Sequence, residues 1–229
     1  ASLVIFVNLL PLRSIKYKDD FLFFSKIYLE ESVIQKILKT QEIELPSIYS
    51  ELYKLQTFNS WIVSFTTLHE SIQSKTSLVS FKDEITINSL MTMTIRTEII
   101  LKEYVEKKTG SFINDLKGVF KILSDINDSK ILKNIENEYL LTRLDDRPVC
   151  LFQKINGLNK IKHWKKIDFE ILKYILKFIT ARNYFAHHYY LDNQIRFSSS
   201  DLAREILESS LITLVLIIDL NKHDKKIPS

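Results

Sequence analysis

Residues 168–190 read DFEILKYILKFITARNYFAHHYY and carry the periodicity of one long helix. At about 100° per residue, the apolar side chains of its first part share one arc of that helix. These are Ile171, Leu172, Ile175, Leu176, Phe178 and Ile179. Lys173 and Lys177 fall on the opposite side. The pattern predicts a helix that packs into a core through one face.

Three polar side chains, Arg182, Asn183 and His187, continue the apolar arc instead of joining the lysine face. With Arg182 set at zero, Asn183 lies at about 100° and His187 at about 140°. Burying a guanidinium without partners is costly, so we expect the arc to open here onto a cleft, a subunit interface or a bound anion. Such a cluster suits phosphate chemistry, because Arg stabilises developing negative charge and His moves or positions a proton.

The composition favours an all-α fold. The chain has 229 residues but only 3 Gly and 4 Pro, which is too few turn-forming residues for a β-sandwich or a nucleotide-binding α/β sheet. We predict a helical bundle with the motif on a long helix in its C-terminal half. Residues 2–8 are β-branched and are either a short strand or the start of a helix. No linker divides the chain, so residues 1–229 are expected to form one unit, with residues 1–80 as an N-terminal helical subdomain beside a core of residues 81–229.

Apolar periodicity and helix-terminating residues predict where the other helices lie. The expected helices span residues 18–39, 45–68 with Pro46 in the first turn, 82–108 closing at Gly110, 111–127 with a weak point at Gly118, 131–141, and 202–220 after a capping Ser200. The last of these contains an apolar run, Leu211–Leu220, that is too short to span a bilayer and is expected to be a buried helix.

Positive charge is concentrated around the motif. The net charge is +4, yet residues 151–190 hold eight Lys and Arg against two acidic residues, so this segment alone carries +6. Such an excess favours a polyanionic partner. Residues 160–166 also contain Trp164, which can stack on a base, although a solvated loop explains the segment equally well. The candidates for RNA binding are Lys162, Lys165, Lys166 and His188.

Cysteine and metal-ligand patterns are sparse. Cys150 is the single cysteine, so it makes no internal disulfide and no thiol zinc site, and we expect a cytoplasmic protein without membrane attachment. His188 and Asp192 are spaced i,i+4 but lack a third ligand, so we expect no metal and no other cofactor. The sequence begins with Ala1 and not Met, which suggests a trimmed, fragmentary or processed chain.

The run Arg-Asn-Tyr-Phe-Ala-His, followed by His-Tyr, resembles the signature of the HEPN superfamily (higher eukaryote and prokaryote nucleotide-binding). That signature is an Arg, a polar residue that is often Asn, a few variable residues and then a His, on a helix of an all-α bundle. Arg182, Asn183 and His187 match it with four residues between Arg and His, and Ala186 precedes the His as in many members. The match covers residues 181–190.

The resemblance implies a metal-independent endoribonuclease. Members typically form homodimers in which the two motif helices meet and the two Arg/His sets build one composite cleft. The RNA 2′-hydroxyl attacks the adjacent phosphate and leaves a 2′,3′-cyclic phosphate and a 5′-hydroxyl. His187 would act on the 2′-hydroxyl or the leaving oxygen, Arg182 would stabilise the phosphorane, and Asn183 would orient them. Many members serve antiviral defence, as CRISPR-associated or abortive-infection ribonucleases, or act as toxins.

Two further expectations follow from the resemblance. In one toxin branch a Tyr two residues after the His is AMPylated by a partner nucleotidyltransferase, and Tyr189 occupies that position. An antitoxin of this kind, or a sensor domain that gates the nuclease, is therefore a candidate partner.

His188 lies near 240°, off the arc, and is either a second catalytic His or exposed to solvent.

A non-catalytic function is the alternative to the enzyme. Arg and His near a helix C-terminus can simply cap carbonyls or pair with acids. The alternative is thus a helical module that binds RNA, a nucleotide or a protein. An Arg182 held in an ion pair within one chain would favour the module, whereas Arg182 and His187 from two subunits within reach of one phosphate would favour the enzyme.

Overall fold

The computed structural model describes residues 17–73, 79–126, 131–133, 135, 152–153, 155–157, 165–187 and 200–222. Within these ranges the regular secondary structure is helical and no strand occurs, which confirms the predicted all-α class. The expectations for residues 2–8, Cys150, Lys162, His188 and Tyr189 lie outside the described residues.

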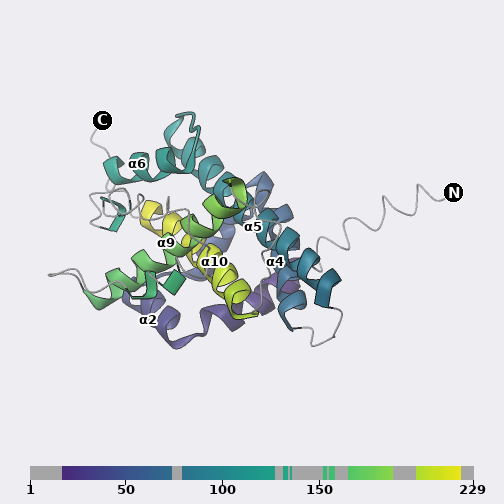
Figure 1. Ribbon diagram of the computed structural model, residues 1–229. Helices are drawn as coiled ribbons and strands as arrows, with labels where there is room; N and C mark the ends of the chain where they lie inside the picture. The colour runs from purple at the N-terminus through teal and green to yellow at the C-terminus, as the bar shows by residue number, and fades with distance from the viewer. Residues whose placement is uncertain are drawn as a thin grey trace.

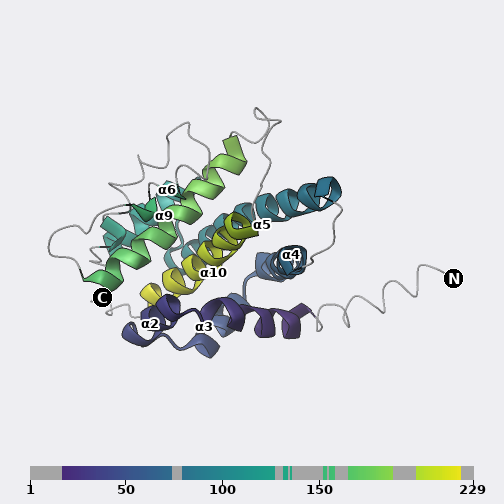
Figure 2. The same ribbon diagram turned by 60° about the horizontal axis from the view of Figure 1, so that its bottom comes forward.

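The helices form a bundle around one long, buried element (Figures 1 and 2). After a helical segment at residues 17–29 come α2 (Ser32–Thr40), α3 (Leu45–Leu52), α4 (Gln56–Gln73), α5 (Val79–Thr109), α6 (Leu116–Ile126), α9 (Lys166–His187) and α10 (Ser200–Lys222). In the part of the chain that the structure describes, no helix has the length and apolar character needed to cross a membrane.

α10 lies at the centre of the bundle. It packs against α9, α5, α4 and α3, and Figure 2 shows it between α9 and the helices of the N-terminal part. Every side chain from Ile206 to Asp219 is buried. The prediction that the apolar run near the C-terminus is a buried helix is therefore confirmed.

Aromatic rings fill the core between the N-terminal helices. The ring of Phe21 makes edge contacts with four other rings, those of Tyr49, Phe58, Trp61 and Phe65. The indole Nε1 of Trp61 donates a hydrogen bond of 2.8 Å to Thr97 Oγ1, which joins α4 to α5 inside the core. The buried ring donor thus has its partner.

Two helices that the periodicity predicted as continuous are each broken. The helix expected over residues 18–39 is interrupted at Glu30 and Glu31, where Glu31 takes an extended backbone (φ −59°, ψ 137°). The helix expected over residues 45–68 divides into α3 and α4. Here Glu103 of α5 accepts hydrogen bonds from the amides of Gln56 and Thr57 at 2.9 and 3.4 Å. The first two amides of α4 thus find their hydrogen-bond acceptor in a residue far along the chain. Because this acceptor is not a neighbour in sequence, local periodicity could not reveal the break.

The loop between α5 and α6 follows a glycine, as predicted. Gly110 has φ +68° and donates its amide to Glu106 O at 2.8 Å, which closes α5. α6 begins later than expected, after Asp115, whose Oδ1 accepts from the amide of Gly118 at 2.7 Å. A Cβ on Gly118 would lie 3.2 Å from Ile113 Cγ2, so this glycine allows the loop before α6 to lie close to the helix. α6 runs from Leu116 to Ile126 without a break at Gly118.

Candidate functional site

The last turns of α9 bury a different set of side chains from the one that the apolar arc predicts. Arg182 and Asn183 are half-buried and Ala186 is exposed, whereas the buried residues are Thr180, Ala181, Tyr184 and Phe185. The reason is that α9 packs against both α10 and α5, so its buried surface is wider than one stripe. The motif therefore lies at the edge of the core, where polar groups keep access to solvent.

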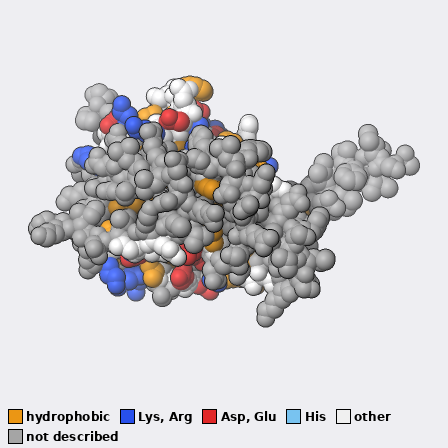
Figure 3. Space-filling model, in the orientation of Figure 1, with side chains coloured by type: hydrophobic (Ala, Val, Ile, Leu, Met, Phe, Trp, Pro, Cys, Tyr) orange, Lys and Arg blue, Asp and Glu red, His pale blue; other side chains and the backbone are white. Residues whose placement is uncertain are grey.

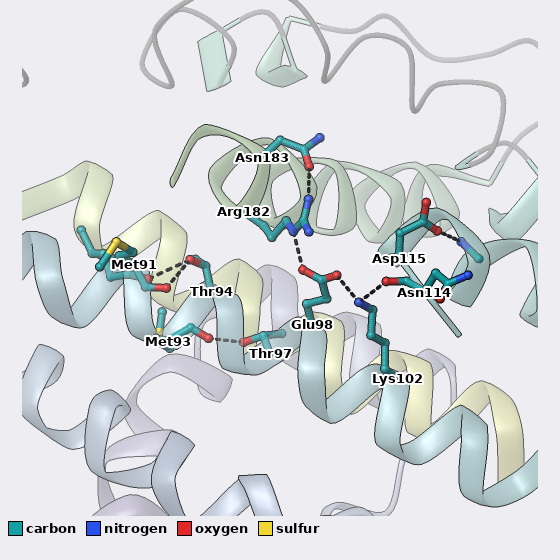
Figure 4. Close-up of polar contacts among 12 residues, drawn as sticks. Met91, Met93, Thr94, Thr97, Glu98, Lys102, Asn114, Asp115, Arg182 and Asn183 are labelled. Carbon is teal, nitrogen blue, oxygen red and sulfur yellow. Dashed lines mark hydrogen bonds and ion pairs between the residues drawn. The ribbon is translucent and has the colours of Figure 1, made fainter. Parts of the chain in front are cut away.

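Arg182 is held by an acidic residue of α5 (Figure 4). Its Nε donates to Glu98 Oε2, and its Nη1 donates to Asn183 Oδ1 at 3.0 Å. The Glu98 side chain is 6% exposed and that of Arg182 is 16% exposed. Because the carboxylate is nearly out of water, the ion pair orients the guanidinium strongly.

Glu98 is shared between two cations. Its second oxygen, Oε1, lies 2.8 Å from Lys102 Nζ. Lys102 Nζ also donates to the carbonyl oxygen of Asn114 at 2.7 Å, which links the cluster to the loop after α5. One carboxylate between an Arg and a Lys leaves the cluster with one excess positive charge, which suits an anion.

Sequence reasoning missed Glu98 and Lys102. Their one local signal is the i,i+4 spacing of a Glu and a Lys on the expected helix over residues 82–108. That spacing is typical of solvent-exposed helix pairs. The burial of Glu98 depends on α9, which the helix pattern does not show.

The guanidinium of Arg182 keeps capacity for a ligand. Of the five N–H donors of an Arg side chain, the described residues engage two. The pairing through Nε fixes the plane of the group, and the described residues leave its other three N–H donors, all on Nη1 and Nη2, unengaged. Arg–phosphate contacts are commonly bidentate, so a fixed plane favours such recognition.

His187 is the last residue of α9, and its backbone lies about 7.5 Å further along the helix axis than that of Arg182. The His187 side chain lies outside the described part of the chain, as do His188 and Tyr189. Among the predicted catalytic residues, the structure thus brings together Arg182 and Asn183 and joins Glu98 and Lys102 to them.

The predicted RNA-binding residues Lys165 and Lys166 lie at the other end of α9, about 24 Å along the axis from Arg182. Both are exposed, and with Lys36 of α2 they line a cavity of about 610 Å³. Figure 3 shows cationic side chains gathered over α2 at its lower left. These lysines are too far away to contact the phosphate that Arg182 would bind.

Searches against protein-family models, curated proteins and solved structures find no match to this chain. Within the described ranges, no group of three His, Cys, Asp or Glu side chains is placed to hold a metal ion.

Proposed function

We propose that this chain is a HEPN-type, metal-independent endoribonuclease that acts as a homodimer, in antiviral defence of the CRISPR-associated or abortive-infection kind or as a toxin. The observation that carries the proposal is the orientation of Arg182. Buried Glu98 holds this guanidinium through Nε, beside Asn183 and on the same helix as His187, and leaves further donors available.

The proposed reaction is attack of the RNA 2′-hydroxyl on the adjacent phosphorus, with departure of the 5′-oxygen. His187 takes the proton of the 2′-hydroxyl or supplies one to the leaving oxygen. Arg182 stabilises the negative charge that develops on the phosphorane oxygens, and Asn183 orients the groups. Lys102 adds positive charge at the same place, since it shares Glu98 with Arg182.

Helix geometry supports a contribution from two subunits. His187 follows Arg182 by five positions, so ideal helix geometry places the two positions about 140° apart around the axis of α9. A single helix does not direct both groups to one phosphate easily. Two copies of α9 that meet would allow Arg182 of one chain and His187 of the other to act together.

A second candidate function is favoured by the Arg182–Glu98 ion pair itself. The pair lies within one chain, so it gives Arg182 a structural partner even without a substrate. A non-catalytic module that binds RNA, a nucleotide or a protein would use the same contact to hold α9 against α5. The two candidates therefore differ in whether Arg182 and His187 are needed for turnover.

The deciding experiment is RNA cleavage in EDTA by the wild type, Arg182→Ala and His187→Ala, with the product ends identified. We expect cyclic-phosphate and 5′-hydroxyl ends from the wild type. We expect both variants to lose at least about 100-fold in rate, as enzymes do when one transition-state donor is removed.

Arg204→Ala is a matched control, because Arg204 pairs through its Nε with Glu208 at 2.8 Å but lies on α10 and is 46% exposed. This variant should cleave like the wild type. If all four proteins are folded and dimeric and none cleaves RNA, the enzyme proposal is wrong. Equal cleavage by all four would point to a contaminant and would refute it as well.

A further inference from the structure

Phe112 is the most exposed large apolar side chain of the described residues. It is 83% exposed, and the next is Phe23 at 66%. Leaving a Phe in water forgoes roughly 1.5–3 kcal/mol of burial. A single exposed apolar residue is ordinary on a protein surface, but Phe112 is held by an anchored loop and lies in a groove.

The backbone that follows Phe112 is anchored at two points. After Phe112, the amide of Ile113 donates to Glu106 Oε1 at 2.8 Å, and the carbonyl of Asn114 accepts from Lys102 Nζ at 2.7 Å. The Ile113 side chain is 4% exposed and packs into the core. Phe112 is thus presented outward from a fixed loop and is not the tip of a loose one.

Phe112 lines a groove of about 650 Å³ together with Ile99, which is 43% exposed. Lys102 lines the same groove and is also the residue that pairs with Glu98. The groove therefore adjoins the Arg182 cluster. Asn114, whose carbonyl oxygen accepts from Lys102 Nζ, follows Phe112 by two positions, at most about 7 Å of chain.

The charges that line the groove are Lys102 and Lys107 against Glu103 and Glu106, so they balance only with Lys102, which also pairs with Glu98. Lys107 lies 2.9 Å from Glu103, and Glu106 accepts the amide of Ile113. A groove of this kind offers an aromatic and an aliphatic face without a strong excess of charge, so it suits the uncharged face of a base. The adjacent Arg182 and Lys102 suit the phosphate that follows the base.

We propose that Phe112 and Ile99 form a stacking subsite for an unpaired base of single-stranded RNA, next to the phosphate bound at Arg182. Aromatic side chains beside cationic groups bind single strands in this way, and they tolerate every base because each has a π-face. The inference rests on the proposed function, because it assigns a substrate subsite to the same cluster. It makes the substrate single-stranded at the position beside the cleaved bond.

The test is the affinity for a fluorescent single-stranded 2′-O-methyl RNA, measured by anisotropy in EDTA. This probe lacks the attacking hydroxyl, so binding is measured without cleavage. Phe112→Ala should weaken binding by roughly 5- to 150-fold, as the loss of one base stack does. Phe112→Trp should bind as tightly as the wild type or more so. Phe23→Ala removes the other strongly exposed Phe and should leave the affinity unchanged.

A second probe with abasic sites identifies the contact as stacking. The penalty of Phe112→Ala should shrink when the base that occupies the subsite is missing. In a cleavage assay, the same variant should raise KM while kcat stays near that of the wild type.

Equal RNA affinity of Phe112→Ala and the wild type would overturn the inference. If Phe112→Ala loses a dimer contact or a bound protein but keeps its RNA affinity, the inference is also overturned, and the surface belongs to a protein partner. These results would leave cleavage by Arg182 and His187 intact, so the subsite can fail without the proposed function. No RNA binding by the wild type would refute both.

Discussion

Removing the carboxylate of Glu98 tests the candidate site most directly. Glu98→Ala leaves Arg182 and Lys102 close together without a counter-charge. Breaking a fully buried pair costs about 3–5 kcal/mol, whereas an exposed pair is worth about 0–1 kcal/mol. The side chains of Arg182 and Lys102 are 16% and 22% exposed, so water screens part of the charge. We expect a loss of about 2–3 kcal/mol of unfolding free energy, which lowers Tm by roughly 4–12 °C in a protein of this size.

The assay is a double-mutant cycle at pH 7 with Glu98→Gln and Arg182→Gln, in which urea unfolding gives the four free energies. The coupling energy isolates the ion pair from the loss of each side chain. Glu51 and Lys54 form the matched control, because they pair at 2.7 Å on the surface with 35% and 64% exposure. Their coupling should stay below about 1 kcal/mol. A Glu98–Arg182 coupling no larger than this control would refute the view that α5 and α9 are joined through a buried pair.

Two further predictions concern helix ends. Asp115→Ala should lower the free energy of unfolding by about 1 kcal/mol in the same urea titration, because it removes the acceptor for the Gly118 amide. Asp115→Asn keeps an acceptor oxygen and should lower the free energy of unfolding much less. An Asp115→Ala variant as stable as the wild type would exclude this cap. Burial alone would raise the pKa of Glu103, but hydrogen bonds from Lys107 and the first two amides of α4 outweigh it and hold the pKa below its usual 4.5. Stability from ionised Glu103 is therefore complete above about pH 4.5 and is lost as the pH falls through the lowered pKa. The gap in unfolding free energy between the wild type and Glu103→Gln should stay constant above about pH 4.5 and narrow as the pH falls below it, and a gap that does not narrow would contradict the assignment.

The start and end of several helices could be predicted from local sequence. Pro46 lies in the first turn of α3, as its fixed φ favours. Gly110 ends α5 in the left-handed conformation that glycine adopts without strain. The two breaks in the N-terminal half were not predictable in this way. The break before α4 is stabilised by Glu103, 47 residues after Gln56, and no pattern within one helix reports a cap from another helix.

The sequence by itself determined the all-helical class, the long motif helix and the placement of Arg182 and Asn183 near its end. These follow from apolar periodicity, scarce Gly and Pro, and capping residues, which act between neighbours in the chain. Only the tertiary structure decided the partners of the motif. Glu98 is 84 residues from Arg182 and becomes its counter-ion because α5 packs against α9. The loop that carries Phe112 is joined to the same cluster by the hydrogen bond from Lys102 to Asn114. Contacts of this kind depend on how helices pack in space, and the spacing of residues along one helix does not encode them.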